Sequence, residues 1–339
     1  MDSTDVAACW EANAETWTRH ARAGYDLYRD ALNTPVFLAN LPDIAGLSGL
    51  DIGCGEGSNT RKLAEAGGRM TAIDIAPTFI RHAREAEAAA PLGIDYRPGD
   101  GTALPFPDAQ FDFATAFMSL MDMPFQDKAL AEAARVLKPG GFLQFSILHP
   151  CFAPPYRKVL RDDAGNIRAI EVGRYFDGVD GEIETWRFGA APAAVKASVE
   201  PFRVPRFHRT LSQWVAMIVA AGLTIEHMAE PHVDAETAKA VPYLADTHIV
   251  PLFLHIRALA GADMQEERDA AALTRRRPRP RRRWRRRPPS QRVPARAPRS
   301  RCIRHRSEPW RDRQRLRLPS AWRAPSSPAR CRPAPARRA

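Results

Sequence analysis

The sequence predicts an α/β fold built on a doubly wound, mostly parallel sheet with helices on both faces. Strand-like and helix-like segments alternate between residues 47 and 148, which is typical of parallel strands joined by crossover helices. A bare turn at residues 53–57 follows the first apolar segment, and its three alternate glycines allow a sharp bend without Cβ clashes. A strand, a bare turn and a helix N-terminus in this order predict a ligand-binding edge at the carboxyl ends of the strands.

The N-terminal segment is expected to be helical and to pack on the sheet. Aromatic and alanine residues recur at helical spacing over residues 6–40, so we expect Trp10 and Trp17 to be buried against the main domain. Tyr25 and Tyr28 follow in the same segment. Their position leaves two interpretations open, packing or contact with a bound ligand.

The core elements after the glycine turn follow from apolar periodicity and from proline and glycine breaks. Pro77 suits the first turn of a helix, Pro91 ends it, and Lys138-Pro139-Gly140-Gly141 ends a later one. The expected order is a helix at 61–66 with Ser58 or Thr60 as its cap, a strand at 70–73, a helix over 77–90, a strand at 94–97, a strand at 111–117, a helix carrying Leu130, Ala134 and Leu137, and a strand at 142–148.

Acidic residues follow three of the expected strands. Asp51 lies at the end of the first strand, and Asp74 at the end of the second, 17 residues past Gly57. A carboxylate at the end of the second strand is suited to binding ribose hydroxyls. Asp100 lies between two glycines after the third strand, where it either accepts a hydrogen bond from an adenine amino group or forms a simple turn. Ser58 stands where a dinucleotide-binding fingerprint has its third glycine, so the loop departs from that fingerprint; a tight turn without a ligand is the other alternative.

The motifs together resemble those of class I S-adenosylmethionine-dependent methyltransferases. The residues that carry the resemblance are Leu50-Asp51-Ile52-Gly53-Cys54-Gly55-Glu56-Gly57, Asp74, Gly99-Asp100 and the segments at 106–116 and 134–143. They are most similar to the type 11 small-molecule group, which includes quinone-biosynthesis enzymes. The resemblance is strong over residues 50–148 and loose over 1–260. It implies a Rossmann-like sheet of seven strands, the last of them antiparallel, and S-adenosylmethionine as the cofactor.

The resemblance also implies a role for each motif residue. The glycines would allow close approach of the backbone, Asp51 would hold the ammonium of the aminoacid end, Asp74 the ribose and Asp100 the adenine. The full set of implied cofactor residues is Asp51, Gly53, Gly55, Gly57, Asp74, Ile75, Asp100, Gly101 and Met118. Residues 1–45 would form a helical lid whose Tyr25 and Tyr28 touch cofactor or substrate.

The segment after the fifth strand is expected to be an insertion. Residues 149–209 are rich in aromatic and basic residues and would lie beside the cofactor mouth, either as a specificity element or as a structural cap. Within them, residues 174–183 indicate a loop or hairpin with Asp-Gly turns. Residues 210–261 would close the domain at 46–261, whose core is 50–148, with a helix at 212–221, a strand at 223–228, and a strand at 248–259 that has Pro251 near its start.

Two side chains are candidates for a catalytic base. His149 lies just beyond the fifth strand, and Asp122 lies after the fourth strand, over the expected crevice. The sequence leaves open whether an O, N, C or S atom would be methylated. Its five cysteines include no Cys-x-x-Cys pair, and no metal-ligand spacing occurs, so we expect no metal.

The charge of the chain is divided unevenly. Residues 275–339 hold 25 of the 50 basic and 2 of the 39 acidic residues, which leaves residues 1–274 with 25 basic and 37 acidic residues. The acidic part would repel nucleic acid. The Arg/Pro-rich tail, 262–339, is expected to be disordered. Because residues 275–339 contain no lysine, we favour an overextended or frame-shifted reading of a GC-rich gene over an RNA-binding arm.

Three classes of function therefore remain. A methyltransferase acting on a small molecule is favoured. An RNA-directed methyltransferase would need the tail, and an NAD-dependent oxidoreductase is disfavoured by Ser58. There is no hydrophobic signal core and no apolar run of about 20 residues, so we expect a cytoplasmic protein without a membrane partner.

Overall fold

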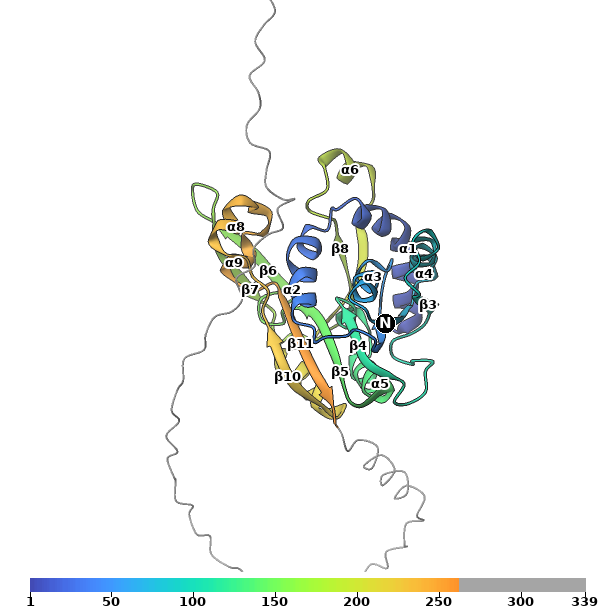
Figure 1. The fold of residues 1–339 in the computed structure, drawn as a ribbon. Coiled ribbons are helices and arrows are strands. Elements are labelled where there is room, and N and C mark those ends of the chain that lie inside the picture. The colour runs from blue at the N-terminus through green and yellow to red at the C-terminus, as the bar shows by residue number, and fades with distance from the viewer. Residues whose placement is uncertain (262–339) are drawn as a thin grey trace, which may run out of the picture.

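A seven-stranded sheet organises residues 1–261, which are the residues that the computed structural model describes (Figure 1). The strand order is β10-β11-β5-β4-β1-β2-β3. Strand β11 is antiparallel to both of its neighbours, and the other pairs are parallel. The strands are β1 Ser48–Ile52, β2 Arg69–Asp74, β3 Asp95–Pro98, β4 Phe111–Phe117, β5 Leu137–Leu148, β10 Leu223–Ala229 and β11 Phe253–Ala260. The expected fold class, with seven strands and an antiparallel last strand, is confirmed.

Helices cover both faces of this sheet. On one face, α5 (Gln126–Val136) and α7 (Leu211–Ala220) bury Leu130, Trp214 and Ile218 against β1, β4, β5 and β11. On the other face, α3 (Ser58–Glu65) and α4 (Pro77–Ala89) bury Leu63 and Ile80 against β2 and β4. The chain order reverses between β1 and β4, so the carboxyl ends of these strands leave a crevice at which ligands bind in such sheets.

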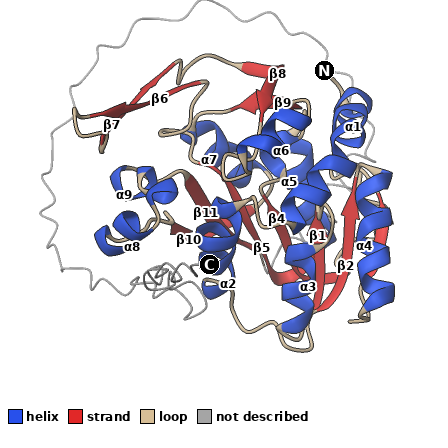
Figure 2. Ribbon diagram, turned by 90° about the horizontal axis from the view of Figure 1, so that it is seen from above, coloured by secondary structure: helices blue, strands red, loops and turns tan. Residues whose placement is uncertain are grey.

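The N-terminal segment packs across the carboxyl edge of the sheet. It consists of α1 (Ser3–Arg22), a π-helical turn at Arg29–Asn33 and α2 (Thr34–Ala39). Helix α1 contacts α4, and Asn13 Nδ2 donates a hydrogen bond to the carbonyl of Arg203 at 3.0 Å. Figure 2 shows α1 next to the β8–β9 hairpin. The N-terminal segment is therefore held between the core and the insertion that follows β5.

The insertion forms two separate antiparallel hairpins and one short helix. The first hairpin pairs β6 (Tyr156–Arg161) with β7 (Ile167–Gly173), and the second pairs β8 (Val179–Trp186) with β9 (Phe202–His208). Helix α6 (Ala193–Ser198) lies in the connection between β8 and β9. Residues 174–183 do not form a hairpin of their own: they connect β7 to β8 and begin the latter.

Three details of the expected elements are wrong. Leu137 begins β5 and is not part of α5, which ends at Val136, so residues 138–141 lie within the strand. Neither Ser58 nor Thr60 caps α3, because Gly57 is the N-cap residue and the Thr60 hydroxyl donates instead to Asp51. The last strand begins at Phe253 and not at His248, because Pro251 has no N–H to give to the β-ladder. The residues before it form α8 (Ala235–Ala240), a 3₁₀ turn at Pro242–Leu244 and α9 (Asp246–Ile249), a helical segment that the sequence analysis missed.

The expected tail at 262–339 lies outside the described residues. None of the helices in the described part of the chain is long and apolar enough to cross a membrane.

Candidate functional site

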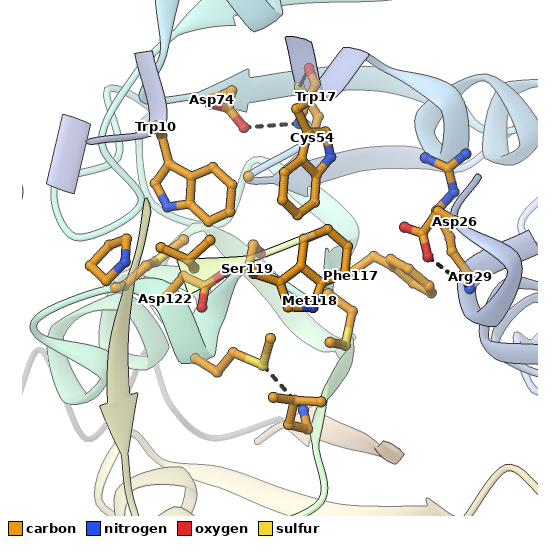
Figure 3. A pocket seen from close by; sticks show the side chains of 18 of the residues that line it. Trp10, Trp17, Asp26, Arg29, Cys54, Asp74, Phe117, Met118, Ser119 and Asp122 are labelled. Carbon is orange, nitrogen blue, oxygen red and sulfur yellow. Dashed lines mark hydrogen bonds between the residues drawn. The ribbon is translucent and has the colours of Figure 1, made fainter. Parts of the chain in front are cut away.

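A cavity of about 500 Å³ lies at the carboxyl ends of β1, β2, β4 and β5 (Figure 3). Its floor is the glycine turn, and its walls come from α1, the π-helical turn, the β8–β9 hairpin and the residues before β11. Ligand pockets of about 300–1,000 Å³ accommodate cofactors and drug-sized molecules. The size and position of the cavity therefore suit a nucleoside-sized ligand together with a small second molecule.

The glycine turn is held tightly against β2. The backbone N–H groups of Gly53 and Cys54 both donate to the carbonyl of Ile73, at 2.8 and 2.9 Å. Gly53 has a φ of +76°, and a Cβ at this position would lie 2.4 Å from Ser119 Cβ. A side chain at residue 53 is therefore excluded by both conformation and space. The result is a bare backbone surface at the bottom of the cavity.

Asp74 lies at the end of β2 with both carboxylate oxygens engaged by the backbone. Its Oδ2 accepts from the N–H of Gly55 at 2.8 Å, and its Oδ1 accepts from the N–H of Ala76 at 2.9 Å. Burial raises the pKa of Asp74 to about 6, although both N–H donors oppose that rise. The residue lines the cavity beside Ile75, as expected of a carboxylate that meets a polar ligand there.

Asp51 is buried at the end of β1 and is satisfied by two threonines. The hydroxyls of Thr60 and Thr115 donate to its two oxygens at 2.6 and 2.8 Å. Burial raises the pKa of Asp51, and the two hydroxyl donors lower it. Asp51 also lines the cavity. Its hydrogen bonds with Thr60 and Thr115 connect β1 to α3 and β4 beneath the turn.

Asp100 and the other predicted cofactor residues lie at the same edge. The Asp100 carboxylate accepts from the N–H and the hydroxyl of Thr102, both at 2.8 Å, which forms a closed turn. Gly101 and Met118 line the cavity with it, and Met118 has a φ of +54° directly after β4. The structure thus gathers the predicted set around one cavity, except Gly57, which lies outside the lining.

The two candidate bases are in different places. Asp122 lines the cavity, and burial raises its pKa well above the ordinary range. His149 does not line it: Nδ1 accepts from the N–H of Cys151 at 3.1 Å, and Nε2 lies 2.9 Å from a carboxylate oxygen of Glu230. Burial lowers the pKa of His149, and Glu230 opposes that shift. Since both ring nitrogens are engaged away from the cavity, only Asp122 faces the predicted reaction space.

The aromatic residues of the N-terminal segment also differ in whether they line the cavity. Tyr28 lines the cavity and donates its hydroxyl proton to Asp246 Oδ1 at 2.8 Å. Tyr25 is not part of the lining and packs instead beside His20, at a ring separation of 5.7 Å. Trp10 and Trp17 both line the cavity and contact each other edge to face at 5.3 Å. Both are half-buried: Trp10 packs beside Phe79 of α4, and Trp17 stacks on Trp186 of the insertion.

Several lining residues escaped the sequence analysis. They come from segments that lack a motif, and the most polar of them are Asp26, Arg29, Asn59, Arg157, Glu184 and Arg206. Two signals were available: the helical spacing of Asp26 and Arg29 beside Tyr25 and Tyr28, and the expected place of residues 149–209 beside the cofactor mouth. The described residues include no group of three or more His, Cys, Asp or Glu side chains placed to hold a metal ion.

Comparison with known proteins identifies the family of the core domain. Residues 50–145 match the family described as "Methyltransferase domain". A crystal structure of an S-adenosylmethionine-dependent methyltransferase from Mesorhizobium loti superposes with a TM-score of 0.54 at 27% identity, covering 66% of this chain and 96% of that one. Residues 50–145 are a class I, type 11 methyltransferase domain. The family and this neighbour imply S-adenosylmethionine as its methyl donor.

This chain matches curated methyltransferases over part of their length. Demethylmenaquinone methyltransferase of Tropheryma whipplei (strain Twist) is 40% identical over 120 residues, which are 34% of this chain and 49% of that protein. Malonyl-[acyl-carrier protein] O-methyltransferase of Pseudescherichia vulneris is 34% identical over 143 residues, 42% of this chain and 53% of that protein. The chain thus spans about half the length of the curated relatives it matches.

Proposed function

We propose that this protein transfers a methyl group from S-adenosylmethionine to a small organic acceptor. The observation that carries the proposal is a single cavity that joins the bare turn at Gly53, the carboxylates of Asp74 and Asp100, and a largely apolar second wall. The two curated relatives are named for methylation of a demethylmenaquinone and of a malonyl-[acyl-carrier protein], which supports an organic acceptor.

The residues at the carboxyl edge fit the donor. The absence of a side chain at Gly55, where an added Cβ would meet no atom within 4 Å, leaves room for a ligand against the backbone. Asp74 would accept hydrogen bonds from the ribose hydroxyls, Asp100 would contact the adenine, and Asp51 would add negative charge beneath the aminoacid end. The bound donor supplies an electrophilic methyl group on a sulfonium sulfur. The protein contributes position, orientation and exclusion of water, which are the main sources of acceleration in such a transfer.

The acceptor would lie against the second wall of the cavity. The side chains there are mostly apolar or aromatic: Phe117, Met118, Met121, Leu148, Tyr243, Leu252 and Phe253. Asp122 is the proposed proton acceptor for the nucleophile, because it faces the cavity and carries a pKa raised by burial. An apolar or aromatic acceptor with one ionisable group suits this combination.

Binding measurements test the function directly. Calorimetry on the full chain should show binding of S-adenosylmethionine and of S-adenosylhomocysteine, and no binding of NAD. A screen of small acceptors with labelled methyl donor should then find transfer of the label. The proposal fails if neither nucleoside binds, and the oxidoreductase alternative gains support if NAD binds instead.

A further inference from the structure

Two oppositely charged side chains of the N-terminal segment lie at the wall of the cavity. Asp26 precedes the π-helical turn and Arg29 begins it, and both line the cavity with Gly55, Ser58 and Asn59. Figure 3 shows this pair and Asp74 on opposite sides of Cys54. The pair therefore lies across the glycine turn from the proposed ribose site.

Arg29 has donors to spare. Nε donates to Asp30 Oδ1 at 2.8 Å, Nη2 donates to the carbonyl of Ala21 at 3.3 Å, and Nη1 lies 3.5 Å from Glu56 Oε1. A guanidinium carries five N–H donors, and a contact of 3.5 Å is at the limit of a hydrogen bond. The side chain is 15% exposed, so an anion that reached it in the cavity would meet a largely desolvated cation.

Asp26 has an open acceptor. Among the described residues, its hydrogen-bond donor is the backbone N–H of Arg29, which reaches Oδ1 at 3.2 Å. An ionised carboxylate can accept about four hydrogen bonds. Burial raises the pKa of this carboxyl, so the ionised form is under-solvated and would gain from a cationic partner. Oδ2 is left to make that contact.

The position of Asp26 and Arg29 indicates which part of the methyl donor they would contact. Glu56, the residue after Gly55 in the turn, contacts both Arg29 and Arg22, which anchors this part of the N-terminal segment to the turn. In the methyl donor, adenine and ribose are uncharged, the sulfonium is a single cation, and the aminoacid end carries one carboxylate and one ammonium. Only that end matches a cation and an anion three residues apart.

We propose that Arg29 and Asp26 bind the carboxylate and the ammonium of the aminoacid end of the methyl donor. This inference rests on the proposed function. It assigns the recognition of both charges to the N-terminal segment, with Asp51 beneath the turn as a second neighbour of the ammonium, which has three N–H donors to share. Binding of the donor would thereby fasten the N-terminal segment over the cavity.

A pair of ligands that differ in the aminoacid end tests the proposal. S-adenosylhomocysteine has this end, and 5′-methylthioadenosine lacks it. In calorimetry on the full chain, Arg29→Gln should weaken binding of S-adenosylhomocysteine by about 10- to 100-fold, as expected for a lost charge-assisted hydrogen bond, and leave 5′-methylthioadenosine binding unchanged. Asp26→Asn should show the same selectivity, and Arg29→Lys should retain part of the affinity.

The matched control is Arg22→Gln, which removes the other cationic partner of Glu56 but does not line the cavity. It should leave both affinities as they are. The proposal is overturned if Arg29→Gln weakens both ligands equally, if it weakens neither, or if Arg22→Gln has the same effect. Circular dichroism of each variant establishes folding, and Arg29→Lys keeps the test valid if Arg29→Gln does not fold. If the unaltered protein binds neither ligand, the proposed function fails as well.

Discussion

We expect Asp74 to make binding of the methyl donor depend on pH. Its pKa of about 6 is above the ordinary 3.8, so the carboxyl is protonated below pH 6 and ionised above it. In the proposed site, ribose hydroxyls would donate to the ionised form, and a proton on the carboxyl would compete with them. We therefore expect the affinity for S-adenosylhomocysteine to rise between pH 5 and 7, with the change centred near pH 6.

The Asp74→Asn variant should lose this pH dependence and bind more weakly at pH 7.5, by about 10-fold or more, since one hydrogen bond to a charged group is lost. Calorimetry at several pH values makes the comparison. If the pH profile of the variant is unchanged, Asp74 is not the group that binds the ribose hydroxyls.

We expect Asp122 to affect the rate of transfer rather than the binding of the donor. Removing a general base typically lowers kcat by about 10²- to 10⁴-fold. We expect Asp122→Asn to lower kcat within that range and to leave the affinity for S-adenosylhomocysteine unchanged. The burial that raises its pKa also predicts that kcat of the unaltered enzyme rises with pH, because only the ionised carboxylate accepts a proton. A His149→Gln variant, whose altered side chain lies outside the cavity, should keep most of its kcat.

At the scale of the element, the lack of a side chain at Gly49 in β1 makes room for the ring of Phe113, its partner in β4. A Cβ there would lie 2.2 Å from Cζ of Phe113, whose ring is fully buried and stacks on Phe142 at 5.5 Å. Gly49→Ala should therefore destabilise the protein by about 1–3 kcal/mol through overpacking.

Denaturant titration or thermal unfolding measures this effect. Gly178→Ala is the matched control, because no atom lies within 4 Å of its added Cβ and its φ does not require glycine. That variant should be neutral or slightly stabilising. Equal effects of both substitutions would contradict the overpacking argument.

At the scale of the whole molecule, the described part of the chain supplies lining of the cavity from the N-terminal segment, the core and the insertion. This lining runs from Val6 to Phe253. We expect deletion of residues 262–339 to leave the affinity for S-adenosylhomocysteine within about 2-fold, since the deleted segment supplies none of the described lining. Calorimetry on the shortened and full chains compares them. A loss of about 10-fold or more would show that the arginine-rich tail contributes to the site and would revive the RNA-directed alternative.

The elements of the core could be predicted from the sequence, because their causes are local. Alternating apolar segments specify β1 to β5, the glycines at 53, 55 and 57 specify a turn with positive φ, and Pro77 starts α4. The same local order placed Asp51, Asp74 and Asp100 at strand ends, which parallel pairing then brings to one edge.

Only the tertiary structure decided which of these side chains are free to act. The sequence could not show that Asp51 is satisfied by Thr60 and Thr115, or that His149 is engaged outside the cavity. It also could not show that the walls come from segments far apart in the chain, as in the contact of Tyr28 with Asp246, 218 residues away. Periodicity reports how a residue lies on its own element, whereas a cavity is made by elements whose approach depends on long-range packing.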